Sequence, residues 1–403
     1  MVDSTVESIK QLPSSNLPLP TVFLEFLQKN CIDPSLYDLH DSIPRYIRIK
    51  RGNESYLQKI EAELKCNLQA VSWLPGFFAI PSYIHIASLS IYREGKIYGM
   101  DAASGAAVLA LNVLPGDHVL DLCAAPGAKL CMLSDMLGDT GSLTGVDISR
   151  QRLAACRTML QKYALGDHCR LFVADGTSFS LLPLRKNLNA KLCSGSEKSE
   201  YNQYVFKEWS SRRRWIERKN AKKTSIISGT SEPELIFYGR YSGIIGLSKC
   251  EIFDKRFEHE NSDFGYDKVL VDAECTHDGS IKHVQKFEHW GWETLQRRLL
   301  DAQRMDNLMH LQLQLLTNGF KLLKDGGTLV YSTCSLTTAQ NESILEQFLL
   351  KNKHAGLVEI DLAKDWPCKS GRIPKTLRFD PCTSKTSGLF VAKLVKRSKY
   401  ENK

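Results

Sequence analysis

The stretch HVLDLCAAPGAKLCML at residues 118–133 decides the fold that this sequence predicts. It opens with an apolar run typical of a buried strand, turns through small residues and continues with the spacing of a helix. Small side chains in the turn let the backbone close on a ligand, and the free N–H groups of the helix N-terminus suit a carboxylate. Many folds contain one such turn, so the neighbouring segments decide what it binds.

Similar short apolar runs alternate with helical stretches along the rest of the chain. We expect strands at 118–122, 142–147, 169–174, 268–272 and 328–332. This alternation predicts an α/β fold in which helices cover both faces of a mostly parallel sheet. Ligands of such sheets bind at the carboxyl ends of the strands, so the residues that end each strand are candidates for a site.

The two strands expected after the turn, at 142–147 and 169–174, end in or just before a carboxylate. Asp147 stands where an acidic side chain accepts hydrogen bonds from both ribose hydroxyls, and Asp175 is placed to meet an adenine edge. The turn at 123–128 has no G-x-G-x-x-G, which argues against a nicotinamide dinucleotide, and no P-loop signature. The pattern predicts a cleft for a nucleoside cofactor with an amino-acid tail.

Two other strand ends are followed by cysteines, in VDAECTHDG at 271–279 and YSTCS at 331–335. A single cysteine is most often an inert small apolar residue. Cys275 and Cys334, however, are expected at the same sheet edge as the cofactor turn, with Asp272 beside them. Two thiols that face one cleft predict thiol chemistry.

These motifs resemble those of the NOL1/NOP2/Sun family (NSUN, Fmu/RsmB-like) of RNA cytosine-5 methyltransferases. The resemblance covers 99–396 and includes the turn at 121–129, Asp272 with Cys275, Thr333-Cys334-Ser335 and a final hairpin-like segment at 379–396. It implies a class I S-adenosylmethionine-dependent methyltransferase domain, Rossmann-like with a mostly parallel sheet, after a small N-terminal α+β accessory domain at 1–98. It also implies formation of 5-methylcytosine in tRNA or rRNA.

The resemblance also implies roles for single residues. The cofactor-binding set would be Cys123, Ala124, Ala125, Pro126, Gly127, Ala128, Lys129, Asp147, Arg152, Asp175 and Asp272. Cys334 would be the nucleophile, Cys275 would help to release the product, and Asp272 would bind the cytosine amide edge. Carbon 5 of cytosine is too electron-poor to attack a methyl sulfonium, so a thiolate must first add to carbon 6.

One position departs from the family pattern, because Glu274 stands where the family usually has proline before the first cysteine. Proline would restrict the local backbone. A carboxylate beside Cys275 should also disfavour its thiolate, so we expect an effect on product release more than on methylation. His277 is either a local base that offsets this or a plain polar loop residue.

The accessory segment reads as a helix near 21–30, a strand at 44–50, a helix at 54–64 and a β-rich stretch at 68–80. In the strand, Ile47 and Ile49 alternate with Arg45, Arg48 and Lys50, which predicts a half-buried strand with a basic outer face. The segment is either a packing cap or an RNA-binding module.

A basic, poorly ordered insertion is expected at 181–263, far longer than an ordinary connection. It is either a solvated loop or an arm that contacts phosphates, with Trp209 and Trp215 stacking on bases.

The composition limits the remaining possibilities. The 403 residues carry a formal net charge of +8, which suits an anionic partner. Twelve cysteines without a C-x-x-C pair indicate reduced thiols and no metal site. Residues 1–20 lack a targeting pattern, so we expect the protein in the nucleus, nucleolus or cytoplasm. No apolar run could span a bilayer, so we expect no membrane partner. We also expect a monomer with RNA as its partner.

Three other functions compete with this interpretation. A DNA cytosine-5 methyltransferase would place its nucleophile where Cys275 lies, but Thr333-Cys334-Ser335 argues against it. A non-catalytic RNA-binding or assembly protein would keep the fold without turnover. A cysteine hydrolase would use Cys275 and His277, which lack a third, orienting group.

Overall fold

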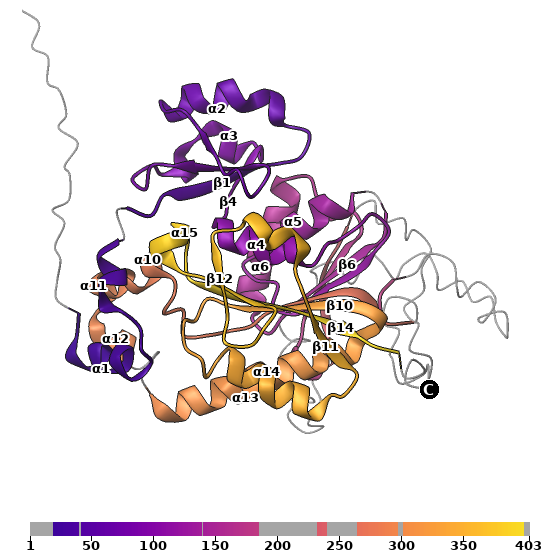
Figure 1. Ribbon diagram of the computed structural model, residues 1–403. Helices are drawn as coiled ribbons and strands as arrows, with labels where there is room; N and C mark the ends of the chain where they lie inside the picture. The colour runs from indigo at the N-terminus through magenta and orange to yellow at the C-terminus, as the bar shows by residue number, and fades with distance from the viewer. Residues whose placement is uncertain are drawn as a thin grey trace, which may run out of the picture.

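The computed structural model describes residues 19–39, 42–138, 140–184, 232–239, 264–296 and 301–398. Within these residues the larger of two sheets has ten strands, drawn at the centre of Figure 1. They are β5 His118–Asp121, β6 Ser142–Asp147, β7 Cys169–Val173, β8 Glu234–Tyr238, β9 Tyr266–Asp272, β10 Leu323–Thr333, β11 Ala355–Val358, β12 Cys368–Ser370, β13 Thr376–Phe379 and β14 Leu389–Lys396.

The spatial order is β12-β13-β14-β10-β9-β5-β6-β7-β8, with β11 paired to β14. All five strands expected from the sequence are present and form the parallel part of the sheet, β10-β9-β5-β6-β7. The chain order reverses between β5 and β9, because β6 and β7 lie on one side of β5 and β9 and β10 on the other. Such a reversal opens a crevice at the carboxyl ends of the strands.

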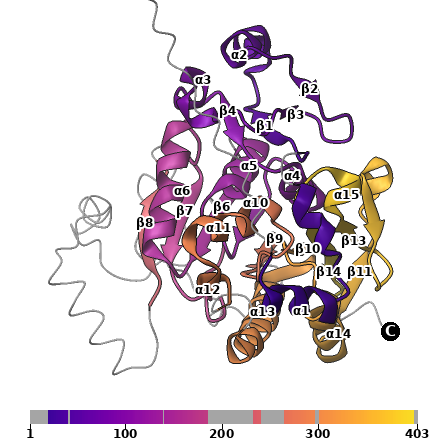
Figure 2. The same cartoon turned by 90° about the vertical axis from the view of Figure 1, so that its left-hand side faces the viewer.

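Helices cover both faces of this sheet (Figures 1 and 2). One face carries α4 Ala102–Ala110, α5 Ala128–Leu137 and α6 Arg150–Lys162, and the other carries α13 Ala302–Leu322 and α14 Glu342–Lys351. Short helical segments η8 Asp361–Asp365 and α15 Pro381–Ser384 join the last strands. The arrangement confirms the predicted α/β class.

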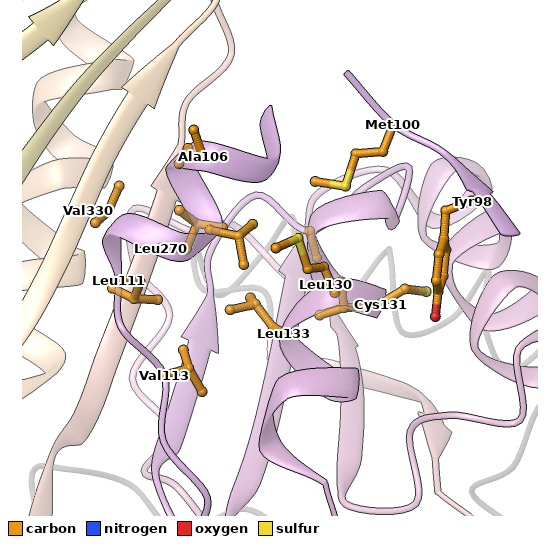
Figure 3. Close-up of a cluster of buried hydrophobic side chains, with 14 of the residues drawn as sticks. Tyr98, Met100, Ala106, Leu111, Val113, Leu130, Cys131, Leu133, Leu270 and Val330 are labelled. Carbon is orange, nitrogen blue, oxygen red and sulfur yellow. The ribbon is translucent and has the colours of Figure 1, made fainter. Parts of the chain in front are cut away.

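The core on the α4–α6 face fixes the turn that precedes α5. Ala106 of α4, Leu130 and Leu133 of α5, Leu270 of β9 and Val330 of β10 are all fully buried in one cluster (Figure 3). Burial of each leucine or valine contributes roughly 1.5–3 kcal/mol relative to exposure. The cluster therefore holds the start of α5 firmly against the sheet edge.

The N-terminal helix packs beside a group of short helices that follow β9 (Figure 1). The elements are α1 Thr21–Lys29, η1 Pro34–Leu39, α10 Ile281–Val284, α11 Lys286–Trp290 and α12 Trp292–Leu295. Phe23 and Leu27 of α1 share a buried cluster with Ile281 and Phe287, and the Tyr37 hydroxyl donates a hydrogen bond to the Asp278 carbonyl at 2.8 Å. The chain around 19–39 thus supports the segment that follows Cys275.

The next part of the chain forms a second, antiparallel sheet in the order β2-β3-β1-β4. Its elements are β1 Arg45–Ile49, η2 Glu54–Tyr56, α2 Leu57–Leu64, β2 Gln69–Ala70, β3 Phe77–Ile80, η3 Ile86–Ser88, α3 Ser90–Arg93 and β4 Ile97–Gly99. Ile47 and Ile49 of β1 pack with Ile60 of α2 on one face, whereas Tyr46 of β1 and Phe77 of β3 pack toward α4 and α5 on the other.

The expected basic outer face of β1 was wrong. Arg48 is only 8% exposed and makes a 2.5 Å ion pair with Asp135 of α5, above the Tyr98 ring. Lys50 donates to the Tyr163 carbonyl at 2.5 Å. The face opposite the isoleucines is an interface with the larger sheet's helices, and a buried arginine is tolerated there because it is paired.

The interval 181–263 was expected to be poorly ordered throughout, and this was wrong for one part of it. Glu234–Tyr238 forms β8, an edge strand antiparallel to β7. The remaining stretches, 185–231 and 240–263, lie outside the described residues, together with Trp209 and Trp215. Among the described helices, none is long and apolar enough to cross a membrane.

Candidate active site

A cleft of about 520 Å³ lies at the carboxyl ends of the parallel strands, where the strand order reverses. That size suits a nucleoside-sized ligand. Its walls include many of the residues predicted from the sequence: Cys123, Ala125, Pro126, Lys129, Asp147, Arg152, Asp175, Asp272 and Cys334. Ala124, Gly127, Ala128 and Cys275 do not line the cleft, although they were predicted in the site.

Those four residues shape the site from behind its surface. Ala124 is 4% exposed and its N–H donates to Val146 of β6 at 2.9 Å, which fixes the turn against the sheet. Gly127 has a φ of 114° and begins α5 without a side-chain cap. The first N–H groups of α5 are therefore available to an anionic ligand. Arg152 supports the same turn, since its guanidinium donates to the Ala125 carbonyl at 2.9 Å.

Asp147 lies at the end of β6 with part of its hydrogen-bonding capacity in use. One oxygen accepts from the Ala125 N–H at 3.2 Å and the other from the Ser149 N–H at 2.8 Å. Each carboxylate oxygen has a second lone pair, which leaves capacity for two hydroxyl groups. Beside it, Ile148 leaves 70% of its side chain exposed on the cleft wall, as an apolar platform for a flat ring.

Asp175, at the end of β7, accepts hydrogen bonds from the N–H and hydroxyl of Thr177 at 2.9 and 2.8 Å. These contacts orient its carboxylate where it lines the cleft beside Gly176. An uncapped helix start, a carboxylate with free lone pairs, an apolar platform and a second carboxylate fit the carboxylate, ribose and adenine of S-adenosylmethionine.

The sequence motifs assigned no role to Asp121, which lies behind the cleft wall, or to Leu311, Leu315 and Ser387, which line the cleft. Asp121, which ends β5, is 1% exposed, and its Oδ2 has no hydrogen-bond partner among the described residues. Burial, followed by the charge of Asp272, raises the pKa of Asp121 to about 7. Its place in the motif at 121–129 was the signal for such a role. Leu311 and Leu315 of α13 and Ser387 lie far from the motifs in sequence and carried no such signal.

The predicted Asp272 is held in an ion pair at the floor of the cleft. Its Oδ2 accepts from the Lys129 ammonium at 2.6 Å, and its Oδ1 accepts from the Ser332 hydroxyl at 2.6 Å. Burial alone lowers the pKa of Lys129, but the adjacent Asp272 carboxylate outweighs it, so this pKa is raised. Lys129 therefore stays charged and positions Asp272 instead of acting as a base.

The two predicted cysteines meet as expected, with their Sγ atoms 3.3 Å apart. The Nδ1 atom of His277 lies 2.9 Å from Cys334 Sγ and 3.7 Å from Cys275 Sγ. Cys275 is buried, Cys334 is half-buried, and His277 as a whole residue is the most exposed of the three, with its ring nitrogen against the sulfurs. The structure thus joins a histidine to the thiol pair, and the expectation of no metal here stays a prediction.

The expected effect of Glu274 on Cys275 stays a prediction, because Glu274 is not among the main causes that set the pKa of this thiol. Burial opposes ionisation of Cys275, yet the hydrogen bond from Cys334 and the nearby His277 lower its pKa to about 6. The pKa of Cys334 is raised instead, chiefly by its hydrogen bond to Cys275. These opposite directions favour a thiolate on Cys275 over one on Cys334 before substrate binds. Glu274 makes a solvent-exposed ion pair with Arg304 of α13, at 3.6 Å.

Hydrogen bonds from buried side chains hold the loop at Glu274, where the family usually has proline. The Gln312 side chain donates to the Glu274 carbonyl at 2.8 Å and to Gln340 at 3.2 Å. Gln340 in turn accepts from the Thr276 N–H at 3.1 Å and donates to the Thr276 hydroxyl at 2.9 Å. Both glutamines are fully buried, and their hydrogen bonds to the loop restrain its backbone, although Gln312 Oε1 has no partner among the described residues.

The strand order, the helix-covered parallel sheet and the cleft at its reversal point define a class I S-adenosylmethionine-dependent methyltransferase. Solved structures agree on the fold. NSun6 from Pyrococcus horikoshii with SFG, an analogue of S-adenosylmethionine, is 15% identical, covers 94% of this chain and 99% of that chain, and has a TM-score of 0.61. A methyltransferase homologue from the same organism is 20% identical, with 94% and 100% covered and a TM-score of 0.57.

A family model described as 16S rRNA methyltransferase RsmB/F matches residues 108–227 and 244–395, more than half of the chain. The chain belongs to this family, which confirms the resemblance to NOL1/NOP2/Sun proteins and the predicted cofactor. The tRNA (cytosine(49)-C(5))-methyltransferase of Pyrococcus abyssi is 24% identical over 87% of this chain and 86% of its own length. The 5-cytosine rRNA methyltransferase NSUN4 of Bos taurus is 29% identical over 66% of this chain, which spans 48% of that relative.

Proposed function

We propose that this protein methylates carbon 5 of cytosine in tRNA or rRNA, with Cys334 as the nucleophile. The observation that carries the proposal is the thiol pair, whose sulfur atoms lie 3.3 Å apart beside Asp272 and at the edge of the nucleoside cleft. The relative from Pyrococcus abyssi is named as a methyltransferase of tRNA, and NSUN4 of Bos taurus as one of rRNA. Both names place the methyl group on carbon 5 of cytosine.

The cofactor would be held by the 123–129 turn, Asp147 and Asp175, and it supplies an electrophilic methyl group when bound. The chain must make carbon 5 of cytosine nucleophilic. A thiolate at Cys334 adds to carbon 6, and the π electrons of the 5,6 bond move toward carbon 5 and the N3 edge of the ring. Asp272, fixed by Lys129 and Ser332, is placed to hydrogen-bond that edge as the charge develops.

Cys275 has two tasks in this scheme. Before addition, it accepts the proton of Cys334 across the 3.3 Å contact, so that the charge of the pair moves to the attacking sulfur. After methylation, the carbon 5 proton is lost to a base and its electron pair restores the 5,6 double bond. Cys334 then leaves carbon 6 as a thiolate, and Cys275 assists this departure by returning the proton that it holds. The lowered pKa of Cys275, about 6, supports this role, because a thiolate at Cys275 can accept the proton of Cys334.

RNA affinity would come partly from basic segments, since the chain has a net charge of +8. The 181–263 interval includes Arg212, Arg213 and Arg214, followed by Lys222 and Lys223. These side chains would contact phosphates, which position an RNA without reading its sequence.

The test is methyl transfer from labelled S-adenosylmethionine to unmodified tRNA and rRNA, with nucleosides separated by mass spectrometry. Label in 5-methylcytidine supports the proposal, and the Cys334→Ala variant should form none. Cofactor binding without label in any RNA would favour the non-catalytic assembly protein. Label in duplex DNA alone would favour the DNA-type enzyme, for which the lowered pKa of Cys275 is a specific argument.

A further inference from the structure

We propose that His277 accepts the first proton of the Cys275–Cys334 thiol pair and so keeps the pair singly ionised for attack on cytosine. This rests on the proposed function, because it concerns how the nucleophile is made ready. The imidazole Nδ1 lies at hydrogen-bond distance from Cys334 Sγ, 2.9 Å, and 3.7 Å from Cys275 Sγ. His277 therefore touches both reacting sulfur atoms.

The backbone at His277 is held in an unusual conformation that brings its ring to the sulfurs. Its φ is 57°, in the left-handed region that a non-glycine residue occupies at a cost. Two hydrogen bonds fix this turn: Ser280 N–H donates to the His277 carbonyl at 3.0 Å, and Gly279 N–H donates to the Cys334 carbonyl at 2.9 Å. The second bond ties the turn of His277 to the nucleophile's own backbone.

Gly279 makes this close approach possible. A Cβ at that position would lie 2.6 Å from the Cys334 carbonyl oxygen and about 3.0 Å from Gly388. The loop that carries His277 can therefore sit against the Cys334 strand end only with glycine there. The backbone geometry supports a precise imidazole–thiol contact.

The charges around the ring favour a proton on it. The titratable groups that face His277 or the thiol pair are Asp272, Glu274, Cys275, His283, Cys334 and Lys129. Burial opposes the charged imidazole, but Cys275, Asp272 and Glu274 raise the pKa of His277. The Lys129 charge is engaged by Asp272 at 2.6 Å, so it opposes the imidazolium less than a free ammonium would.

One S–H bond of the pair breaks, its proton moves to Nδ1 of His277, and its electron pair stays on sulfur as the thiolate. The remaining thiol proton is shared across the 3.3 Å between the sulfurs and moves to Cys275 when Cys334 attacks carbon 6. After Cys334 leaves carbon 6, the imidazolium can return its proton to the pair. No oxidant or further co-reactant is needed.

The test measures thiol reactivity without RNA or cofactor. The full-length protein is alkylated with iodoacetamide from pH 5 to pH 10, and the Cys275 and Cys334 peptides are quantified by mass spectrometry. In the wild type the reaction should reach half its maximal rate near pH 6, the pKa to which Cys275 is lowered. In His277→Gln the midpoint should move toward the ordinary thiol value of about 8.5, which makes alkylation at pH 7 roughly 30-fold slower.

The matched control is His310→Gln, because His310 is an exposed histidine of α13 outside the cleft lining. It should keep the wild-type midpoint. Methylation by His277→Ala should fall at pH 7 and recover at pH 9 or on addition of free imidazole, with S-adenosylmethionine affinity unchanged. An unshifted midpoint in a folded His277→Gln protein overturns the role of His277 while leaving methylation intact. If the wild-type protein methylates no RNA at all, the proposed function is overturned instead.

Discussion

Replacement of Asp147 by asparagine tests the cofactor site at one side chain. The carboxylate already accepts from two backbone N–H groups, at Ala125 and Ser149, and would accept from two ribose hydroxyls as well. In Asp147→Asn, one of the two acceptor oxygens becomes a donor. We therefore expect the loss of one hydrogen bond to a charged acceptor, worth about 1.5–3 kcal/mol, or roughly 10- to 150-fold in Kd.

The assay is isothermal calorimetry with S-adenosylmethionine, alongside a thermal melt. Ser149→Ala is the matched control, because Ser149 caps α6 by accepting from the Arg152 N–H at 3.3 Å but does not line the cleft. It should cost about 1 kcal/mol of stability and leave the affinity within twofold. A folded Asp147→Asn protein with wild-type affinity would refute the assignment of Asp147 to the ribose.

Three further predictions follow from ion pairs and from the basic interval. Arg48→Met and Asp135→Asn should each lower the free energy of unfolding by about 3–5 kcal/mol, and the double variant by less than their sum, as measured in urea. Burial opposes ionisation of Glu342, but its ion pair with Arg378 outweighs burial and lowers the pKa of Glu342 in the folded protein. The ion pair therefore stabilises the fold at neutral pH, and this contribution is lost as the pH falls through the lowered pKa. Glu342→Gln should melt at a lower temperature than the wild type at pH 7 and lose less stability in acid. Deletion of 191–223 should flatten the dependence of log RNA affinity on log salt, and an unchanged slope would make this stretch a solvated loop.

The parallel sheet could be predicted because each of its strands is a short apolar run between helical stretches. Asp147, Asp175, Asp272 and Cys334 could be assigned for the same reason: a residue that ends a parallel strand lies at the sheet edge, wherever it falls in the chain. The structure brings all four to one cleft. Their roles in binding and chemistry stay predictions.

The remaining features depend on contacts between distant segments. In β1 the two isoleucines share one buried face, as the alternation predicts, but only the fold shows that Asp135 of α5 covers Arg48 on the other face. Likewise, only the fold shows that Gln312 of α13, 38 residues away, donates to the Glu274 carbonyl and holds the loop that lacks proline. Similarly, the contact of His277 with Cys334 depends on a left-handed turn and on pairing with a strand 57 residues further along. Sequence periodicity contains none of this information.

Covalent trapping on RNA tests the central claim most directly. Cys275→Ala, Cys334→Ala and the double variant are incubated with unmodified tRNA and rRNA and S-adenosylmethionine, then separated on denaturing gels. If Cys334 adds to carbon 6 and Cys275 assists its release, Cys275→Ala should accumulate a protein–RNA adduct that is absent from the double variant, and Cys334→Ala should form neither adduct nor 5-methylcytidine. An adduct formed by Cys334→Ala but not by Cys275→Ala would contradict the assignment and make Cys275 the nucleophile.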